Sequence, residues 1–253
     1  MNAALRTLST PDTGAGFAQR YLCFPPAGGT VLGLRGLARA VPGVEVWGVE
    51  YPAHGERLVE PAAESLEDIA EEIALDALGH FEAEGLSRIT LIGFSMGAFV
   101  ALEVAQRIQI RERTAPAALI VVGVCAPQLR TPGKYVKAAS IDAVGVLDGI
   151  GDHSPELQEY ALELFLGDLR LTSAYSGPAK VMLSCPIIAI RGEDDPAFAT
   201  GADSLRAWRV WTSGWFTDHV VPGGHLGVLA PGREADFWGL VRQARSAGEP
   251  GDE

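Results

Sequence analysis

Residues 88–98, which read R-I-T-L-I-G-F-S-M-G-A, constrain the fold more than any other stretch of the sequence. Their first half is apolar and β-branched, which predicts a short strand buried on both faces, as in a parallel sheet. Residues 93–97 fit the pattern G-x-S-x-G, and a helical apolar pattern follows as far as Ile108. The sequence therefore predicts a strand, a tight turn that carries Ser95, and a helix.

This context indicates a nucleophilic serine. A sharp turn would lift the hydroxyl of Ser95 clear of the sheet, and glycines at 93 and 97 leave room for the turn. The backbone amide of Met96, at the start of the helix, is placed to donate to an oxyanion. The alternative is an ordinary strand-to-helix turn in which Ser95 is only the N-cap of the helix.

Length and charge limit the classes of function. The 253 residues are 47% hydrophobic, enough for one α/β domain with a sizeable core. There are 20 Lys and Arg residues against 32 Asp and Glu residues, a formal net charge of −12. A chain this acidic is a poor binder of nucleic acid or of an anionic membrane. We expect a monomer that binds neither nucleic acid nor a membrane.

The cysteines and the first residues indicate a cytoplasmic protein. Cys23, Cys125 and Cys185 cannot all pair, and each adjoins an apolar run, so we expect buried free thiols. Residues 1–19 contain no continuous apolar run, so we expect no signal peptide. Residues 1–16 are small and polar, which predicts a loose leader.

The rest of the chain alternates between strand and helix patterns. Strands are predicted at 20–24, 44–49, 118–124, 186–191 and 217–221, and helices at 31–41, 65–85, 202–208 and 233–244. This alternation predicts an α/β fold, a mainly parallel sheet with helices on both faces. Sites in such sheets lie at the carboxyl ends of the strands.

Residues 128–183 break the alternation. They show little strand character and two helical patterns, at 141–150 and 155–171, and they lie between two predicted strands. We expect a single domain over residues 1–253 with this segment inserted as a helical lid, which would cover the site and admit substrate. The alternative is a pair of ordinary crossover helices.

A seryl nucleophile needs a base, and five histidines are available. His225 follows the last predicted strand in a glycine-rich turn, so we choose it. His54 also follows a strand and is the second candidate, although a surface loop there favours a contact with substrate. The remaining three lie on a helix pattern, in the expected lid and inside the last strand: His80, His153 and His219.

The orienting acid is expected in the segment G-E-D-D-P at residues 192–196. Glu193, Asp194 and Asp195 all follow a strand and precede His225, which gives the order Ser, acid, His of the α/β-hydrolases. We choose Asp195, because it ends a G-x-x-D turn that a proline holds. Asp218 is a weaker alternative.

The loop at residues 25–29, P-P-A-G-G, follows the first predicted strand and is expected near Ser95. Its glycines let the backbone approach a ligand, and Ala27 is the candidate for a second oxyanion amide, because Pro26 has no N–H to donate. The constellation predicts acyl transfer through a covalent seryl intermediate. The chain shows no metal-ligand spacing and no nucleotide-binding motif, so we expect no metal and no cofactor.

Five motifs together resemble the type II thioesterases, the stand-alone partners of polyketide synthases and non-ribosomal peptide synthetases. They are L-C-F-P-P-A-G-G (22–29), Y-P-A-H-G-E-R (51–57), G-F-S-M-G-A (93–98), G-E-D-D-P (192–196) and P-G-G-H (222–225). Residues 166–175, L-G-D-L-R-L-T-S-A-Y, resemble the lid segment of that family, L-R-A-D-x-x-x-x-x-Y. The resemblance covers about residues 20 to 240.

The resemblance implies an α/β-hydrolase fold and hydrolysis of acyl thioesters from the phosphopantetheine arm of carrier proteins. The usual role is editing, the removal of stalled or wrongly primed acyl groups, with acyl or peptidyl carrier proteins as transient partners and no cofactor. It places the triad at Ser95, Asp195 and His225, and the oxyanion amides at Ala27 and Met96.

Two positions depart from the family pattern. The family commonly has Pro-Gly-Arg where this chain has residues 52–54, P-A-H, and Phe after the histidine where this chain has Leu226. We expect Pro26, His54, Phe94 and Leu226 to border the acyl or pantetheine channel. The alternatives are a general carboxylesterase, a chain-releasing thioesterase or cyclase on the same fold, and a binding module without catalysis.

Overall fold

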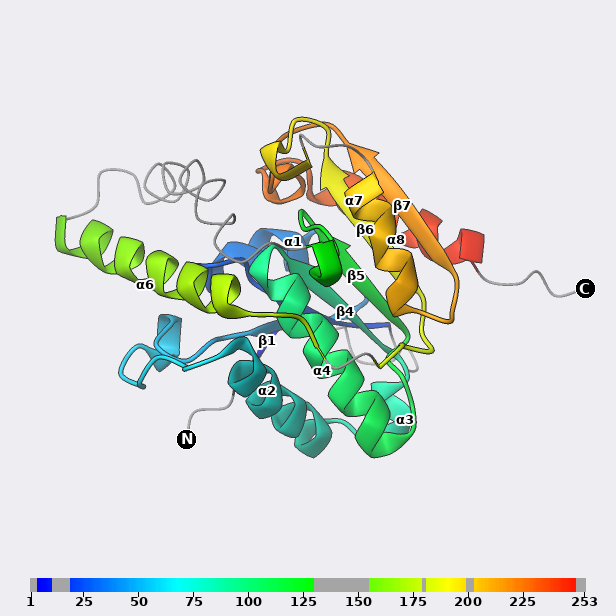
Figure 1. The fold of residues 1–253 in the computed structure, drawn as a ribbon, viewed down its shortest axis with the longest axis horizontal. Helices are drawn as coiled ribbons and strands as arrows, with labels where there is room; N and C mark the ends of the chain where they lie inside the picture. The colour runs from blue at the N-terminus through cyan, green and yellow to red at the C-terminus, as the bar shows by residue number, and fades with distance from the viewer. Residues whose placement is uncertain (1–3, 11–18, 130–154, 179–180, 199–202, 249–253) are drawn as a thin grey trace, which may run out of the picture.

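A computed structural model describes residues 4–10, 19–129, 155–178, 181–198 and 203–248 of the chain. Within these ranges the centre of the molecule is a seven-stranded sheet with the strand order β1-β3-β2-β4-β5-β6-β7 (Figure 1). Every helix in the same ranges is too short or too polar to cross a membrane.

The strands are β1 Leu5–Ser9, β2 Arg20–Phe24, β3 Glu45–Val49, β4 Ile89–Phe94, β5 Ala118–Val122, β6 Ile187–Gly192 and β7 Phe216–Val221. The helices are α1 Arg35–Arg39, α2 Leu66–His80, α3 Ala83–Leu86, α4 Met96–Glu112, α6 Pro155–Ala174, α7 Asp203–Arg206 and α8 Glu234–Gly248. Short 3-10 helices lie at Val31–Leu34, Gly55–Arg57, Pro127–Leu129, Pro196–Phe198, Ala207–Trp211 and Gly227–Leu229.

The parallel sheet predicted from the sequence is confirmed. β2 pairs in parallel with both β3 and β4, and the parallel pairing continues from β4 through β5 and β6 to β7. All six residues of β4 are buried, as expected of a central strand that carries helices on both sides. The strands therefore end at one common edge, where sites in such sheets lie.

Part of the stretch predicted to be a loose leader, residues 1–16, is a strand; residues 1–3 and 11–16 of that stretch lie outside the described residues. Residues Leu5–Ser9 form β1, which pairs antiparallel with β3 at the edge of the sheet. The backbone N–H of Glu50 donates to the carbonyl of Ala4 at 2.8 Å, and the N–H of Ala4 donates to Asp76 Oδ2 at 2.5 Å. Pairing across the chain stabilises this strand, so its own short and polar pattern does not reveal it.

Helices cover both faces of the sheet (Figure 1). One core contains residues of α1 and α8, and here the indole N–H of Trp238 donates to the carbonyl of Leu37 at 2.7 Å. The other core contains residues of α2 and α4, including the fully buried Ile73 and Phe99. α4 is packed in this second core, which fixes Ser95 at its start.

The predicted start of the helix after Ser65 is confirmed, but its predicted end at Gly85 is wrong. Ser65 is the N-cap of α2, and its hydroxyl accepts from the N–H of Asp68 at 3.0 Å, as the capping box predicts. The helix ends at His80, where Phe81 turns into an extended conformation. Gly85 belongs to the separate short helix α3.

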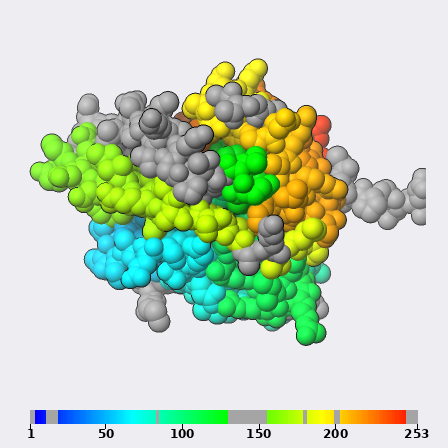
Figure 2. Space-filling model, viewed as in Figure 1, coloured from blue at the N-terminus to red at the C-terminus, as the bar shows by residue number. Residues whose placement is uncertain are grey.

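The segment expected to be a lid lies between β5 and β6. Its described part contains α6, which extends the predicted helix at 155–171 to Ala174. The predicted helix at 141–150 and His153 lie outside the described residues. Figure 2 shows α6 as a yellow-green ridge on the surface, beside the cyan segment that follows β3.

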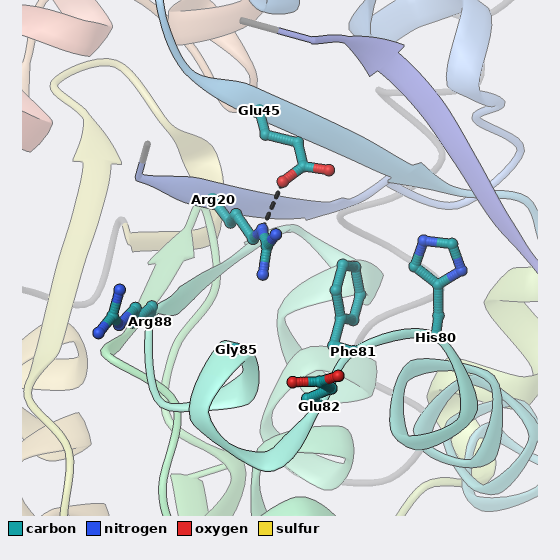
Figure 3. A pocket seen from close by; sticks show the side chains of 7 residues that line it. All are labelled: Arg20, Glu45, His80, Phe81, Glu82, Gly85 and Arg88. Carbon is teal, nitrogen blue, oxygen red and sulfur yellow. Dashed lines mark hydrogen bonds and ion pairs between the residues drawn. The ribbon is translucent and has the colours of Figure 1, made fainter. Parts of the chain in front are cut away.

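A hollow of about 340 Å³ lies at the opposite edge of the sheet, where β2 and β4 begin. Arg20, His80, Phe81 and Arg88 are among the residues that line it, and Arg20 forms an ion pair there with Glu45 (Figure 3). Ser95 follows the other, carboxyl end of β4, so this hollow is separate from the site described below.

Candidate active site

Ser95 lies at the sharp turn between β4 and α4 that the motif predicts. Its φ is 50° and its ψ is −117°, a strained backbone for a residue with a side chain. Its side chain makes no capping hydrogen bond to α4. The alternative in which Ser95 serves only as a helix cap therefore has no support in the structure.

The two glycines of the motif are required by close backbone contacts. A Cβ atom on Gly97 would collide with the carbonyl oxygens of Phe24 and Pro25, and one on Gly93 would collide with the backbone of Ala98. Gly97 therefore lets the loop after β2 pack directly against the start of α4. This contact places the loop that carries Ala27 beside Ser95.

His225 connects Ser95 with Asp195. Its Nε2 atom lies 2.9 Å from Ser95 Oγ, and its Nδ1 atom lies 2.9 Å from Asp195 Oδ2. The side chain of Asp195 is fully buried, and that of His225 is 10% exposed. The three residues follow β4, β6 and β7, so the structure brings the predicted nucleophile, acid and base together at one edge of the sheet.

The structure separates Asp195 from the other candidate acids. Glu193 and Asp194 are exposed, whereas Asp195 is buried. The second carboxylate oxygen of Asp195 accepts the N–H of Ala197 at 2.9 Å, which fixes the side chain in its turn. Asp218 instead forms an ion pair with Arg206 at 3.5 Å.

Two other histidines lie where the sequence predicts them. His80 is the last residue of α2, and its ring packs edge-on against Trp47 at a centroid distance of 4.4 Å. His219 lies in β7, with Nε2 3.3 Å from the hydroxyl of Thr217. Burial lowers the pKa of His219, as expected when a cationic form is desolvated.

The loop after β2 forms a tight turn beside Ser95. The N–H of Gly29 donates to the carbonyl of Pro26 at 2.9 Å, and the buried hydroxyl of Tyr51 donates to the carbonyl of Pro25 at 2.9 Å. Ala27 lies inside this turn and is 9% exposed. The turn and the start of α4, which pack against each other, thus each carry one candidate donor, the amides of Ala27 and Met96.

The candidate channel residues lie in different environments. Pro26 is partly exposed in the loop after β2, and Leu226 is partly exposed beside His225. Phe94 is fully buried on the face that α8 covers, where its ring lies 5.9 Å from that of Phe237. Phe94 is therefore a core residue, because the strand alternation points its side chain into the face of the sheet that α8 covers.

His54 is not the surface residue that its loop predicts, since it is only 3% exposed. Its Nε2 atom lies 3.1 Å from Oδ2 of Asp168, a buried carboxylate on α6. Asp168 was not among the predicted site residues. Its place in the segment 166–175, which resembles the family's lid motif, is the one signal in the sequence that could have identified it.

Two of the three cysteines are the buried free thiols that the sequence predicts. Cys23 and Cys185 are buried, whereas Cys125 is partly exposed just after β5. Burial raises the pKa of Cys23 and of Cys185 to about 12. These two are therefore thiols that pack in the core.

The arrangement can perform nucleophilic acyl transfer. The Asp195 carboxylate accepts the Nδ1–H of His225, so that Nε2 is the nitrogen that takes the proton of Ser95. Among the residues that the structure describes, no group of three or more His, Cys, Asp or Glu side chains could hold a metal ion.

Comparison with known proteins identifies the family of the chain. The family model described as "Thioesterase domain" matches residues 19–236. The thioesterase PikA5 of Streptomyces venezuelae is 31% identical over 217 residues, which cover 83% of this chain and 75% of that protein.

Solved structures of thioesterases resemble the fold over almost the whole chain. RedJ, from the prodiginine pathway of Streptomyces coelicolor, has a TM-score of 0.75 and 29% identity over 94% of this chain and 91% of that chain. The type II thioesterase BorB, from the borrelidin cluster, has a TM-score of 0.79 and 27% identity over 95% and 97%. The chain therefore has the α/β-hydrolase fold that its motifs predicted, and it belongs to the thioesterase family.

Proposed function

We propose that this thioesterase hydrolyses acyl groups from the phosphopantetheine arm of carrier proteins, with Ser95 as nucleophile, His225 as base and Asp195 as the orienting acid. The observation that carries the proposal is the chain of two 2.9 Å contacts from Ser95 through His225 to Asp195. These three residues lie at the sheet edge where this fold carries its catalytic groups, and the chain is a member of the thioesterase family.

The geometry supports a two-step mechanism. His225 takes the proton of Ser95 as Oγ attacks the thioester carbonyl, and the amides of Ala27 and Met96 stabilise the oxyanion. The carbon–sulfur bond then breaks, and the pantetheine thiol leaves with the proton from His225. Water, deprotonated by the same imidazole, attacks the acyl-serine ester and releases the acid and free Ser95.

The relatives support a role in polyketide or non-ribosomal peptide biosynthesis. PikA5 and BorB are named as thioesterases, and BorB as a type II thioesterase of a biosynthetic cluster. In that role the protein would meet acyl or peptidyl carrier proteins transiently in the cytoplasm and remove aberrant acyl groups. The phosphopantetheine arrives with the substrate, so the mechanism uses no cofactor of the enzyme's own.

A matched pair of substrates tests the reaction class. An acyl thioester of N-acetylcysteamine and the corresponding oxygen ester differ only in the atom that leaves. We expect a higher kcat/KM for the thioester, and no turnover of either in Ser95→Ala. Faster cleavage of the oxygen ester would indicate a general carboxylesterase, and a cyclic product from a hydroxyacyl thioester would indicate a chain-releasing cyclase.

A further inference from the structure

One carboxylate oxygen on α6 holds two loops of the catalytic core. Oδ2 of Asp168 accepts the backbone N–H of Gly28 at 2.7 Å and lies 3.1 Å from Nε2 of His54. Gly28 belongs to the loop after β2, and His54 to the loop after β3. Three segments that are far apart in the sequence therefore meet at one atom.

The contacts of the His54 ring require a proton on each of its nitrogens. Nδ1 lies 2.8 Å from the carbonyl oxygen of Pro52, which can only accept, so Nδ1 donates. Nε2 faces Asp168, and this contact is a hydrogen bond only if a proton lies between the two atoms. Because a carboxyl is more acidic than an imidazolium, that proton resides on Nε2. His54 is therefore an imidazolium paired with a carboxylate.

This ion pair is shielded from water. His54 is 3% exposed and Asp168 is 5% exposed. The hydroxyl of Tyr160, also on α6, donates to the carbonyl of Ala53 at 2.6 Å and holds the same loop. The pair borders a cavity of about 280 Å³ between α6, the segment after β3 and α2, and Figure 2 shows the first two side by side. A charge buried in this way is costly to leave without its partner.

Other charged and titratable groups surround His54. Glu50 and Tyr51 face it from its own segment, and the ring of Tyr51 lies edge-on at a centroid distance of 5.7 Å. Tyr160, Glu163 and Arg170 of α6 line the cavity next to it. Glu50 is buried and adds to the negative potential at the ring. Asp168 is the charged group in hydrogen-bond contact with the imidazole, so among these groups it does most to favour the charged form of His54.

The ion pair acts on the loop that carries Ala27. Gly28 is the next residue, and the hydrogen bond from Gly29 to Pro26 closes the turn around both. α6 packs directly on this turn, because a Cβ atom placed on Gly28 would lie 3.1 Å from Cβ of Phe165. Holding the N–H of Gly28 therefore holds the turn that aims the amide of Ala27.

We propose that His54 is a positioning residue: its Nε2 proton lets Asp168 hold the oxyanion loop beneath α6, so that attack by Ser95 depends on the charge of His54. The inference rests on the proposed function in one respect, the assignment of Ala27 as an oxyanion donor. When the proton is lost, the Nε2 lone pair faces the carboxylate, and the repulsion displaces α6 and the loop from one another.

The direction of the pKa shift agrees with this geometry. Burial acts to lower the pKa of His54, but the hydrogen bond and charge of Asp168, with the Pro52 carbonyl and Glu50, outweigh burial and raise it above 6.5. The ion pair is therefore intact in acid and neutral solution and is lost as pH rises through the raised pKa. The loss of the ion pair should therefore slow the attack by Ser95 on the alkaline side of the pH profile.

The test measures the rate at which a fluorophosphonate labels Ser95 between pH 6 and pH 10. The serine oxygen forms a bond to phosphorus, fluoride leaves, and the proton passes to His225. This reaction uses the nucleophile and the oxyanion donors but no thioester, so it remains informative even if the proposed substrate is wrong. The extent of labelling is measured by intact-mass spectrometry of the full-length protein.

Three variants isolate the role of His54. His54→Gln keeps an N–H donor near the place of Nε2 but does not titrate, and His54→Leu removes the donor. His80→Gln changes an exposed histidine at the opposite edge of the sheet (Figure 3) and serves as the matched control. Thermal unfolding of each variant reports whether it folds.

We expect the labelling rate of the wild type and of His80→Gln to fall as the pH rises, and that of His54→Gln to lack this fall. His54→Leu should be slower than the wild type at pH 7 by about tenfold, since misplacing an oxyanion donor costs less than deleting one. An alkaline fall that persists unchanged in His54→Gln would overturn the proposal, as would a wild-type rate in folded His54→Leu. If His54→Leu does not fold, the pH dependence of labelling in His54→Gln, compared with that of the wild type, decides whether the proposal holds.

Discussion

The Nε2 atom of His225 lies 2.9 Å from the hydroxyl oxygen of Ser95, although 130 positions separate the two residues in the sequence. The contact exists because β4 and β7 end at the same edge of the sheet, with β5 and β6 between them. The buried carboxylate of Asp195 fixes the imidazole from the other side. Function therefore depends on the register of four parallel strands.

Ser95→Ala should fold normally and lose activity. Ser95 is partly exposed and makes no capping hydrogen bond to α4, so its hydroxyl contributes little to stability. Without the nucleophile we expect kcat to fall by at least about 10⁴-fold. Steady-state hydrolysis of an acyl thioester and thermal unfolding measure the two effects. Retained turnover in a folded variant would show that another group is the nucleophile.

Asp195→Asn should reduce kcat strongly, whereas Asp194→Asn should not. The amide at 195 cannot hold the imidazole as the carboxylate does, and the expected loss is on the order of 10⁴-fold. Asp194 is exposed, and its backbone N–H donates to the carbonyl of Gly223 at 3.0 Å. The kcat of the two variants at pH 8 is the measurement. A larger loss in Asp194→Asn would reverse the assignment of the acid.

Gly97→Ala should damage both stability and activity. The added methyl group would meet two carbonyl oxygens of the loop after β2, which cannot yield without moving the turn that carries Ala27. We expect the free energy of unfolding to fall by about 1–3 kcal/mol, the usual cost of overpacking.

Gly239→Ala is the matched control for this change. Gly239 lies inside α8, and a Cβ atom there would meet no atom within 4 Å. Alanine is the better helix former, so this variant should gain roughly 0.5–1 kcal/mol. Urea unfolding of both variants distinguishes the two sites, and equal changes of the same sign would show that the contact at Gly97 has no special role.

The contribution of His54 to stability should depend on pH. Because its folded-state pKa is raised, the stabilisation is fully present below the unfolded value of 6.5 and is lost as the pH rises through the folded value. The difference in the free energy of unfolding between the wild type and His54→Gln should therefore be larger at pH 6 than at pH 9. Urea unfolding at both values measures it, and a difference that is independent of pH would refute the ion pair.

Local patterns made the central part of the fold predictable. The strand and turn that lead to Ser95 have a strong apolar pattern with glycines on either side of the serine, and the parallel sheet follows from the alternation of strands and helices. His225 and Asp195 could be chosen because both follow strands in the chain order that this fold requires.

Features that depend on distant contacts were not predictable. β1 is stabilised by its pairing with β3, which its own residues do not show. His54 appears in the sequence as a polar loop residue, and only the placement of α6 over that loop buries it against Asp168. Phe94 precedes the serine, but the alternation of side chains in β4 turns it into the core.

Intact-mass spectrometry of an acyl carrier protein is the most direct test of whether Ser95 removes acyl groups from carrier proteins. The carrier is loaded with acetyl, propionyl or longer acyl groups and incubated with the wild type or with Ser95→Ala. We expect loss of the acyl mass, with phosphopantetheine retained on the carrier, only in the wild type. Acyl carriers that remain intact with the wild type, while simple oxygen esters are cleaved briskly, would show that the protein is not a thioesterase of carrier proteins.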